Sequence, residues 1–141
     1  MEVYKLAVFI AVGIAVSYYD LRCRIIPDRL NLAGLALAVP FVKENIMWFL
    51  AAGGVMLLMA AVSNNAVGGG DVKYAAVMGM FLGFKVFPAL MSACLVCGVV
   101  VLVLLAFRKI KAKDSIPFGP FLFLGGLYIL LGGEILPWTI L

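Results

Sequence analysis

The chain has 141 residues, of which 66% are hydrophobic and only 13% charged, and its mean hydropathy is +1.19. Soluble domains carry about 25% charged residues, so this composition excludes an ordinary soluble protein and indicates one that spans a membrane. The absence of His and the presence of only three Cys exclude Ser–His and Cys–His nucleophile pairs, HExxH and all-Cys zinc sites and His-ligated haem, so we expect no metal or cofactor.

Six apolar runs, bounded by charged residues, Gly and Pro, follow one another along the chain and predict membrane-spanning helices. The runs cover residues 3–19, 30–42, 46–62, 72–83, 86–107 and 116–131. Because the second and fourth runs are short, we expect polar neighbours to extend those two helices. Glycine pairs within the runs, Gly53-Gly54 and Gly125-Gly126, favour close helix packing. The segment 132–141, which contains Trp138, is expected to be an interfacial end.

This organisation predicts an all-α membrane protein with one polytopic domain over residues 1–141, a bundle of about six transmembrane helices. The predicted spans use nearly the whole length, which leaves no room for a separate soluble domain. No small-residue cleavage site follows the first run, so we expect a retained first span and not a signal peptide.

The basic residues divide unequally between the two ends of such a bundle. Three of them, Lys5, Lys43 and Lys85, fall at one end. The other eight, at the opposite end, are Arg22, Arg24, Arg29, Lys73, Arg108, Lys109, Lys111 and Lys113. Because basic residues gather on the cytoplasmic side, we expect a cell membrane protein with this second end in the cytoplasm and both termini outside. Anionic lipid headgroups then explain the net charge of +4, and no nucleic-acid partner is expected.

Asp20 closes the first predicted span, at the boundary between hydrocarbon and the cytoplasmic end. An i,i+4 ion pair with Arg24 on an extended helix is one explanation for a charge at this position. A carboxylate at a helix C-terminus, however, meets the negative end of the helix dipole, which is unfavourable. This cost favours a functional role for Asp20.

Asp71 follows a run of three glycines, Gly68-Gly69-Gly70, and begins the fourth predicted span. A Gly-rich turn that ends in a capping Asp is a common structural arrangement and is one explanation. Three consecutive glycines exceed what a turn needs and indicate a close approach by another backbone or by an extended substrate. The chain lacks GxxxxGK[ST] and GxGxxG, which argues against a phosphate-binding loop.

Asp20 and Asp71 are both expected at the cytoplasmic ends of spans and at similar depth. Two carboxyl groups a few ångströms apart in a poorly solvated site share one proton. One can then act as general base on a water while the other polarises a carbonyl group and protonates the leaving amine. The pair therefore predicts peptide hydrolysis without His, metal or cofactor.

Three motifs occur in order on the predicted cytoplasmic side: Asp20 with Ile26-Pro27-Asp28 and Asn31, then Gly68-Gly69-Gly70-Asp71-Val72-Lys73, then Ile116-Pro117-Phe118-Gly119-Pro120. In these motifs the chain resembles type IV prepilin peptidases, which are GxGD-type intramembrane aspartic proteases. The resemblance implies that Asp20 and Asp71 are the catalytic pair. It further implies supporting roles for Gly68, Gly69, Gly70, Lys73, Pro27, Asp28, Asn31, Pro117, Phe118 and Gly119.

The chain departs from this family's pattern in two respects. Asp28 stands where the family often has Asn, so we interpret it as a helix cap beside Pro27 and not as a third catalytic acid. The longer bacterial enzymes carry an N-terminal methyltransferase region with paired Cys motifs, which this sequence does not contain. It resembles the short stand-alone peptidases, and we expect no methyltransferase activity from it.

The resemblance implies a membrane aspartic endopeptidase that removes the leader of prepilin-like or pseudopilin precursors, as in type IV pilus and protein secretion systems. The expected partners are the precursor protein and the lipid bilayer. One alternative is a small transporter in which the two carboxylates carry protons or cations. Another is a non-enzymatic membrane subunit of a secretion system, in which they cap helices.

Overall fold

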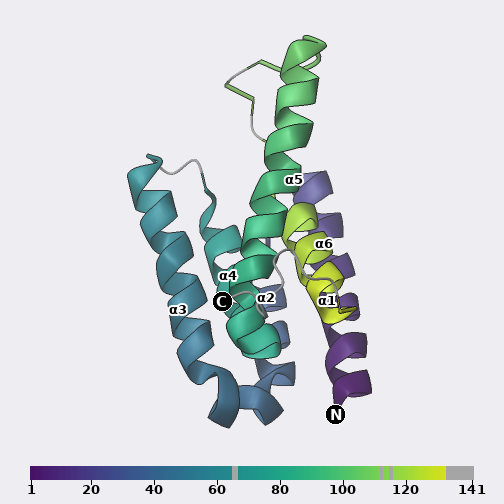
Figure 1. The fold of residues 1–141 in the computed structure, drawn as a ribbon, viewed down its shortest axis with the longest axis vertical. Helices are drawn as coiled ribbons and strands as arrows, with labels where there is room; N and C mark the ends of the chain where they lie inside the picture. Colours follow the sequence, from purple (N-terminus) through teal and green to yellow (C-terminus); the bar gives the residue numbers. More distant parts are fainter. Residues whose placement is uncertain (65–66, 112, 115, 133–141) are drawn as a thin grey trace, which may run out of the picture.

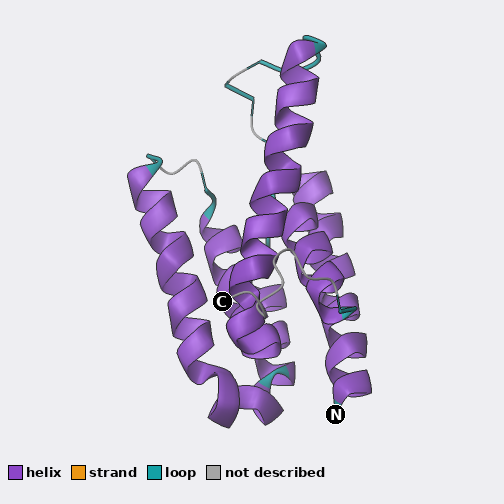
Figure 2. Cartoon of the chain, in the orientation of Figure 1, coloured by secondary structure: helices purple, strands orange, loops and turns teal. Residues whose placement is uncertain are grey.

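The computed structural model describes residues 1–64, 67–111, 113–114 and 116–132, and within these ranges every regular element is helical (Figure 1, Figure 2). This confirms the all-α prediction. The elements are α1 (Glu2–Cys23), α2 (Asp28–Leu37), the 3₁₀ turn η1 (Val39–Phe41), α3 (Val42–Val62), α4 (Gly69–Leu82), the 3₁₀ turn η2 (Gly83–Lys85), α5 (Val86–Ala106) and α6 (Gly119–Leu130). The expected interfacial end at 132–141 lies almost wholly outside the described residues.

In the part of the chain that the structure describes, three helical stretches are long and apolar enough to cross a membrane, namely Glu2–Cys23, Val39–Val62 and Gly69–Ala106. The last of these combines α4 and α5, which are joined directly by η2. The other two helices are shorter: α2 has 10 residues and α6 has 12. Large apolar side chains such as Leu57, Leu58 and Leu102 point outward, as expected of a surface that faces lipid. The structure therefore supports a membrane protein, and six complete spans remain a prediction.

Successive helices run in alternating directions (Figure 1). The last residues of α1, α3 and α5 and the first residues of α2, α4 and α6 lie toward the upper end of the bundle as drawn. The N-terminus and both 3₁₀ turns lie toward the lower end. Residues on three different connections can thus meet at the upper end, although they are far apart in sequence.

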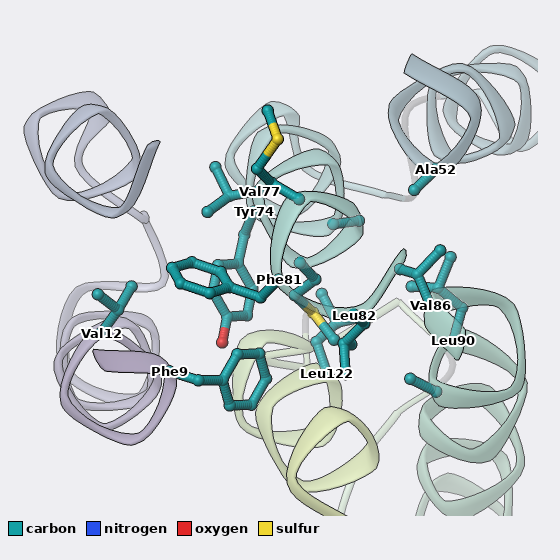
Figure 3. Packing of buried hydrophobic residues seen from close by; sticks show 14 of the residues in the cluster. Phe9, Val12, Ala52, Tyr74, Val77, Phe81, Leu82, Val86, Leu90 and Leu122 are labelled. Carbon is teal, nitrogen blue, oxygen red and sulfur yellow. The ribbon is translucent and has the colours of Figure 1, made fainter. Parts of the chain in front are cut away.

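Helix α4 is the central helix of the bundle, since all residues from Tyr74 to Leu82 are buried. Phe9, Phe81 and Leu122 meet from α1, α4 and α6 in the core, and the rings of Phe9 and Phe81 pack edge to face with centroids 6.1 Å apart (Figure 3). Close packing of α3 on α4 depends on a small residue: a Cβ on Gly53 would lie 3.0 Å from that of Ala76. This packing confirms the expected role of Gly53.

Helix α6 packs against α5 and α1 through glycines. A Cβ on Gly125 would lie 2.5 Å from the carbonyl oxygen of Ala89, and one on Gly126 would collide with the ring of Phe9. Both positions exclude a side chain, as expected from the sequence. Gly83 has a different role, because its φ of 59° ends α4 in a conformation that favours glycine.

Candidate functional site

Asp20 lies in the last turn of α1, which ends where Arg24 adopts the left-handed conformation with a φ of 55°. The N–H of Arg24 donates to the carbonyl oxygen of Asp20 at 2.9 Å and closes the helix. Pro27, three residues on, starts α2 after this turn. Asp20 is only 4% exposed, so its carboxyl group points into the bundle and not toward solvent.

The Asp20 carboxyl group meets the first residue of α6. The backbone N–H of Gly119 donates to Oδ2 of Asp20 at 2.5 Å. The first N–H groups of a helix have no partner within the helix and carry the positive end of its dipole, so they favour a carboxylate. This contact offsets the cost of placing Asp20 at the end of α1. Among the described residues Asp20 makes no ion pair, which argues against the pair with Arg24 considered from sequence.

Glycine at position 119 is required by this contact, because a Cβ there would lie only 2.7 Å from Oδ2 of Asp20. Phe118 is the residue before α6 and packs against the hydrophobic core, which fixes the start of the helix. Pro117 is half-buried in the connection that leads to it. The third motif therefore contacts Asp20 through one backbone donor, the N–H of Gly119. The sequence did not predict this contact.

Asp71 lies in the first turn of α4, three residues after Gly68, which caps the helix. Its N–H donates to the carbonyl oxygen of Gly68 at 3.1 Å. Asp71 is thus not the capping residue itself. Its Oδ1 is buried and has no hydrogen-bond partner in the described part of the chain. Oδ1 can therefore accept a hydrogen bond from a molecule in the site once the carboxyl group turns to expose it.

The glycines before Asp71 differ in what they permit. A Cβ on Gly70 would lie 2.9 Å from Cβ of Ile26 and 3.3 Å from its carbonyl oxygen, so this glycine allows the connection between α1 and α2 to touch α4. The close backbone approach expected from the triple glycine occurs here. A Cβ on Gly69 would meet no atom of the described residues within 4 Å.

The two aspartates come together at the upper end of the bundle. Their carboxyl groups are close enough for the charge on Asp20 to act on Asp71. Helix α6 packs against both α1 and α4 and completes the arrangement. The structure thus places both carboxyl groups at the same end of the bundle, within range of each other's charge.

The remaining candidates tie α2 to α4 beside Asp71. Nζ of Lys73 lies 2.7 Å from Oδ1 of Asp28, and Nδ2 of Asn31 donates to the carbonyl oxygen of Gly70 at 3.5 Å. The interpretation of Asp28 as a helix cap is wrong: Pro27 occupies the cap position and α2 has no side-chain cap bond. Asp28 is the first residue of α2, and its carboxylate turns to the neighbouring lysine instead.

The arrangement supports acid–base chemistry by two carboxyl groups in a largely buried setting. One of them is oriented by a helix N-terminus, and the other has a buried oxygen without a hydrogen-bond partner in the described part of the chain. Within residues 1–64, 67–111, 113–114 and 116–132, no three His, Cys, Asp or Glu residues gather as metal ligands. A carboxyl pair can activate water and protonate a leaving group, as in hydrolysis of an amide.

Comparison with known proteins gives consistent matches. The chain matches the type IV leader peptidase family over residues 7–103, a range that contains both aspartates and ends before Gly119. It is 29% identical to the prepilin leader peptidase/N-methyltransferase of Bacillus subtilis over 144 residues, which covers 95% of this chain and 58% of the relative. The protein of the same name from Stutzerimonas stutzeri is 30% identical over 135 residues, or 86% of this chain and 47% of the relative.

A shorter match is the Escherichia coli leader peptidase HopD, 38% identical over 65 residues that cover 45% of this chain and 42% of the relative. No solved structure matches the chain. The chain spans about half the length of the curated relatives it matches, from 42% to 58% in these three.

Proposed function

Since the chain belongs to the type IV leader peptidase family, we propose that it is a membrane aspartic endopeptidase that uses Asp20 and Asp71 to cleave the leader of prepilin-like or pseudopilin precursors. The observation that carries this proposal is the pairing of the two carboxyl groups at one end of the bundle, with Asp20 held by the N–H of Gly119. The names of the relatives support a prepilin substrate.

Hydrolysis by this pair needs one ionised and one protonated carboxyl group. The ionised carboxylate takes a proton from a water molecule, whose oxygen attacks the carbonyl carbon of the scissile peptide bond. The protonated carboxyl group donates a hydrogen bond to the carbonyl oxygen and stabilises the negative charge that develops there. A proton then passes to the departing amine as the C–N bond breaks. Oδ1 of Asp71 has no hydrogen-bond partner among the described residues, which supports a contact with water or substrate after the carboxyl group turns.

The location of the pair suits a substrate that is itself anchored in the membrane. A precursor whose apolar helix lies in the bilayer presents the bond before that helix at the membrane boundary, where α1 ends and α4 begins. The excess of basic residues at this end of the bundle supports a cytoplasmic active site in the cell membrane.

The proposal is tested with purified protein in detergent, mixed with a prepilin precursor and analysed by gel electrophoresis. Leader release by the wild type, and its loss in Asp20→Ala and Asp71→Ala, is the expected result. Unchanged release by both variants would overturn the assignment of the pair.

The family match supports a protease over the two alternatives considered from sequence, a transporter and a structural subunit. Proton or cation uptake into liposomes tests the transporter directly. Uptake that depends on Asp20 and Asp71, in protein that cleaves no precursor, would replace the present proposal.

A further inference from the structure

A groove of about 420 Å³ lies between α2, α3 and α4, directly beside the segment that carries Asp71. Its upper end is polar, where Asp28, Asn31 and Lys73 line it. The lower part of its wall is apolar and includes Leu35 and Phe49. The groove thus begins at the level of the candidate active site and descends into the part of the bundle that faces lipid.

One glycine in the wall of the groove, Gly54, is not explained by a contact with the described residues. A Cβ on its neighbour, Gly53, would lie 3.0 Å from Ala76, so packing of α3 on α4 accounts for that residue. A Cβ on Gly54 would meet nothing within 4 Å. Glycine inside a helix is less favourable than alanine. In membranes, small residues allow a second helix to approach closely, so Gly54 leaves room in the groove for an apolar helix from outside the chain.

The polar end of the groove suits the start of such a helix. Asn31 is 5% exposed, and its Oδ1 is a buried acceptor without a hydrogen-bond partner among the described residues. The first four N–H groups of any helix lack partners within the helix. Oδ1 is covered, so the carboxamide must turn toward the groove before it can accept one of these groups. A lipid acyl chain has no N–H group to offer, which favours a polypeptide over a lipid.

We propose that this groove binds the apolar helix of the precursor, with the helix N-terminus beside Asn31 and its side packed on Gly54. The inference rests on the proposed function, since it names the part of that substrate which the groove holds. A helix in this orientation descends from the polar end of the groove. The residues that precede it, which form the leader, then lie at the upper end of the bundle near Asp71.

The first test fills the groove and measures cleavage of a membrane-anchored precursor. Gly54→Leu places a bulky side chain in the groove, and we expect the KM for the precursor to rise by about tenfold or more with a much smaller change in kcat. Gly98→Leu is the matched control, because Gly98 is also helical, is exposed and would meet nothing within 4 Å, but does not line the groove. An unchanged KM in Gly54→Leu overturns the inference while leaving the peptidase intact. Absence of cleavage by wild type overturns the proposed function instead.

The second test does not depend on activity or on tolerance of leucine. In a Cys23→Ala, Cys94→Ala, Cys97→Ala background, Gly54→Cys and Gly98→Cys are each labelled with a benzophenone maleimide and irradiated with the precursor in vesicles. The inference predicts an adduct with the apolar segment of the precursor from position 54 and little from position 98. Adducts from position 54 with lipid alone, or equal precursor adducts from both positions, contradict it.

Discussion

The backbone N–H of Gly119 donates a hydrogen bond of 2.5 Å to Oδ2 of Asp20, and so joins the first turn of α6 to the last turn of α1. This contact explains how a carboxyl group can be buried at the end of a helix, where the dipole opposes negative charge. The opposing dipole of α6 compensates for that of α1, and the absent side chain of Gly119 leaves room for the carboxylate. Asp20 is thereby held by the start of α6.

Gly119→Ala tests this contact. The added Cβ would lie 2.7 Å from Oδ2 and 3.2 Å from Cγ of Asp20, so the carboxyl group or the start of α6 must move. We expect kcat for leader release to fall by about tenfold or more, because small displacements of catalytic groups are costly. Gly98→Ala is the control, because a Cβ there would meet no other described residue within 4 Å. Equal rates for the two variants would show that the contact does not position Asp20.

Gly70 and Gly69 form a matched pair for the segment before Asp71. Alanine at position 70 must lie 2.9 Å from Cβ of Ile26, whereas alanine at position 69 meets nothing within 4 Å. We expect Gly70→Ala to destabilise the protein by about 1–3 kcal/mol, as overpacking does, and Gly69→Ala to have a clearly smaller effect. Unfolding midpoints in detergent provide the comparison. A larger loss at position 69 would contradict the packing described for this segment.

The ion pair between Lys73 and Asp28 should contribute little to stability. The two side chains remain 56% and 67% exposed, respectively, although their charged atoms are only 2.7 Å apart. Exposed pairs couple by about 0.2–1 kcal/mol, and salt screens them. A double-mutant cycle with Lys73→Ala and Asp28→Ala should give a coupling energy in this range that decreases with ionic strength. A coupling above about 2 kcal/mol would contradict this reading of an exposed pair.

Tyr74 provides a prediction about the core. The side chain is 1% exposed, and its hydroxyl has no hydrogen-bond partner in the part of the chain that the structure describes. A buried hydroxyl without a partner costs about 1–3 kcal/mol, so Tyr74→Phe should leave stability unchanged or raise it. The midpoint of chemical unfolding measures the effect. A loss of more than about 1 kcal/mol would mean that the hydroxyl is bonded.

Much of the fold follows from local patterns in the sequence. Apolar runs separated by charges, Gly and Pro predict all six α-helices, and alternation of their directions brings Asp20 and Asp71 to the same end of the bundle. These features depend on residues that are close in sequence. The close approach of another backbone segment at Gly70 was also predictable. Three consecutive glycines increase the entropic cost of folding, which favours a packing reason for their presence.

The partners of individual side chains were not predictable in this way. Gly119 is 99 positions from Asp20, and no local pattern links the start of one helix to the end of another. Asp28 follows a proline at the start of a helix, a position that favours a role as helix cap. Its carboxylate instead forms an ion pair with Lys73 on a different helix. Both contacts depend on which helices become neighbours, and that is decided by packing around α4.

The rate of leader release by Asp20→Asn, Asp71→Asn and the double variant tests the central claim most directly. Each change keeps the size of the side chain and removes one carboxyl group. Asp114→Asn is the control, since Asp114 belongs to the connection between α5 and α6 and accepts a hydrogen bond from the N–H of Lys111. If the two aspartates act as one unit, each single variant loses nearly all activity, the double variant is no slower, and the control retains the wild-type rate. Substantial cleavage by either single variant would contradict the two-aspartate mechanism.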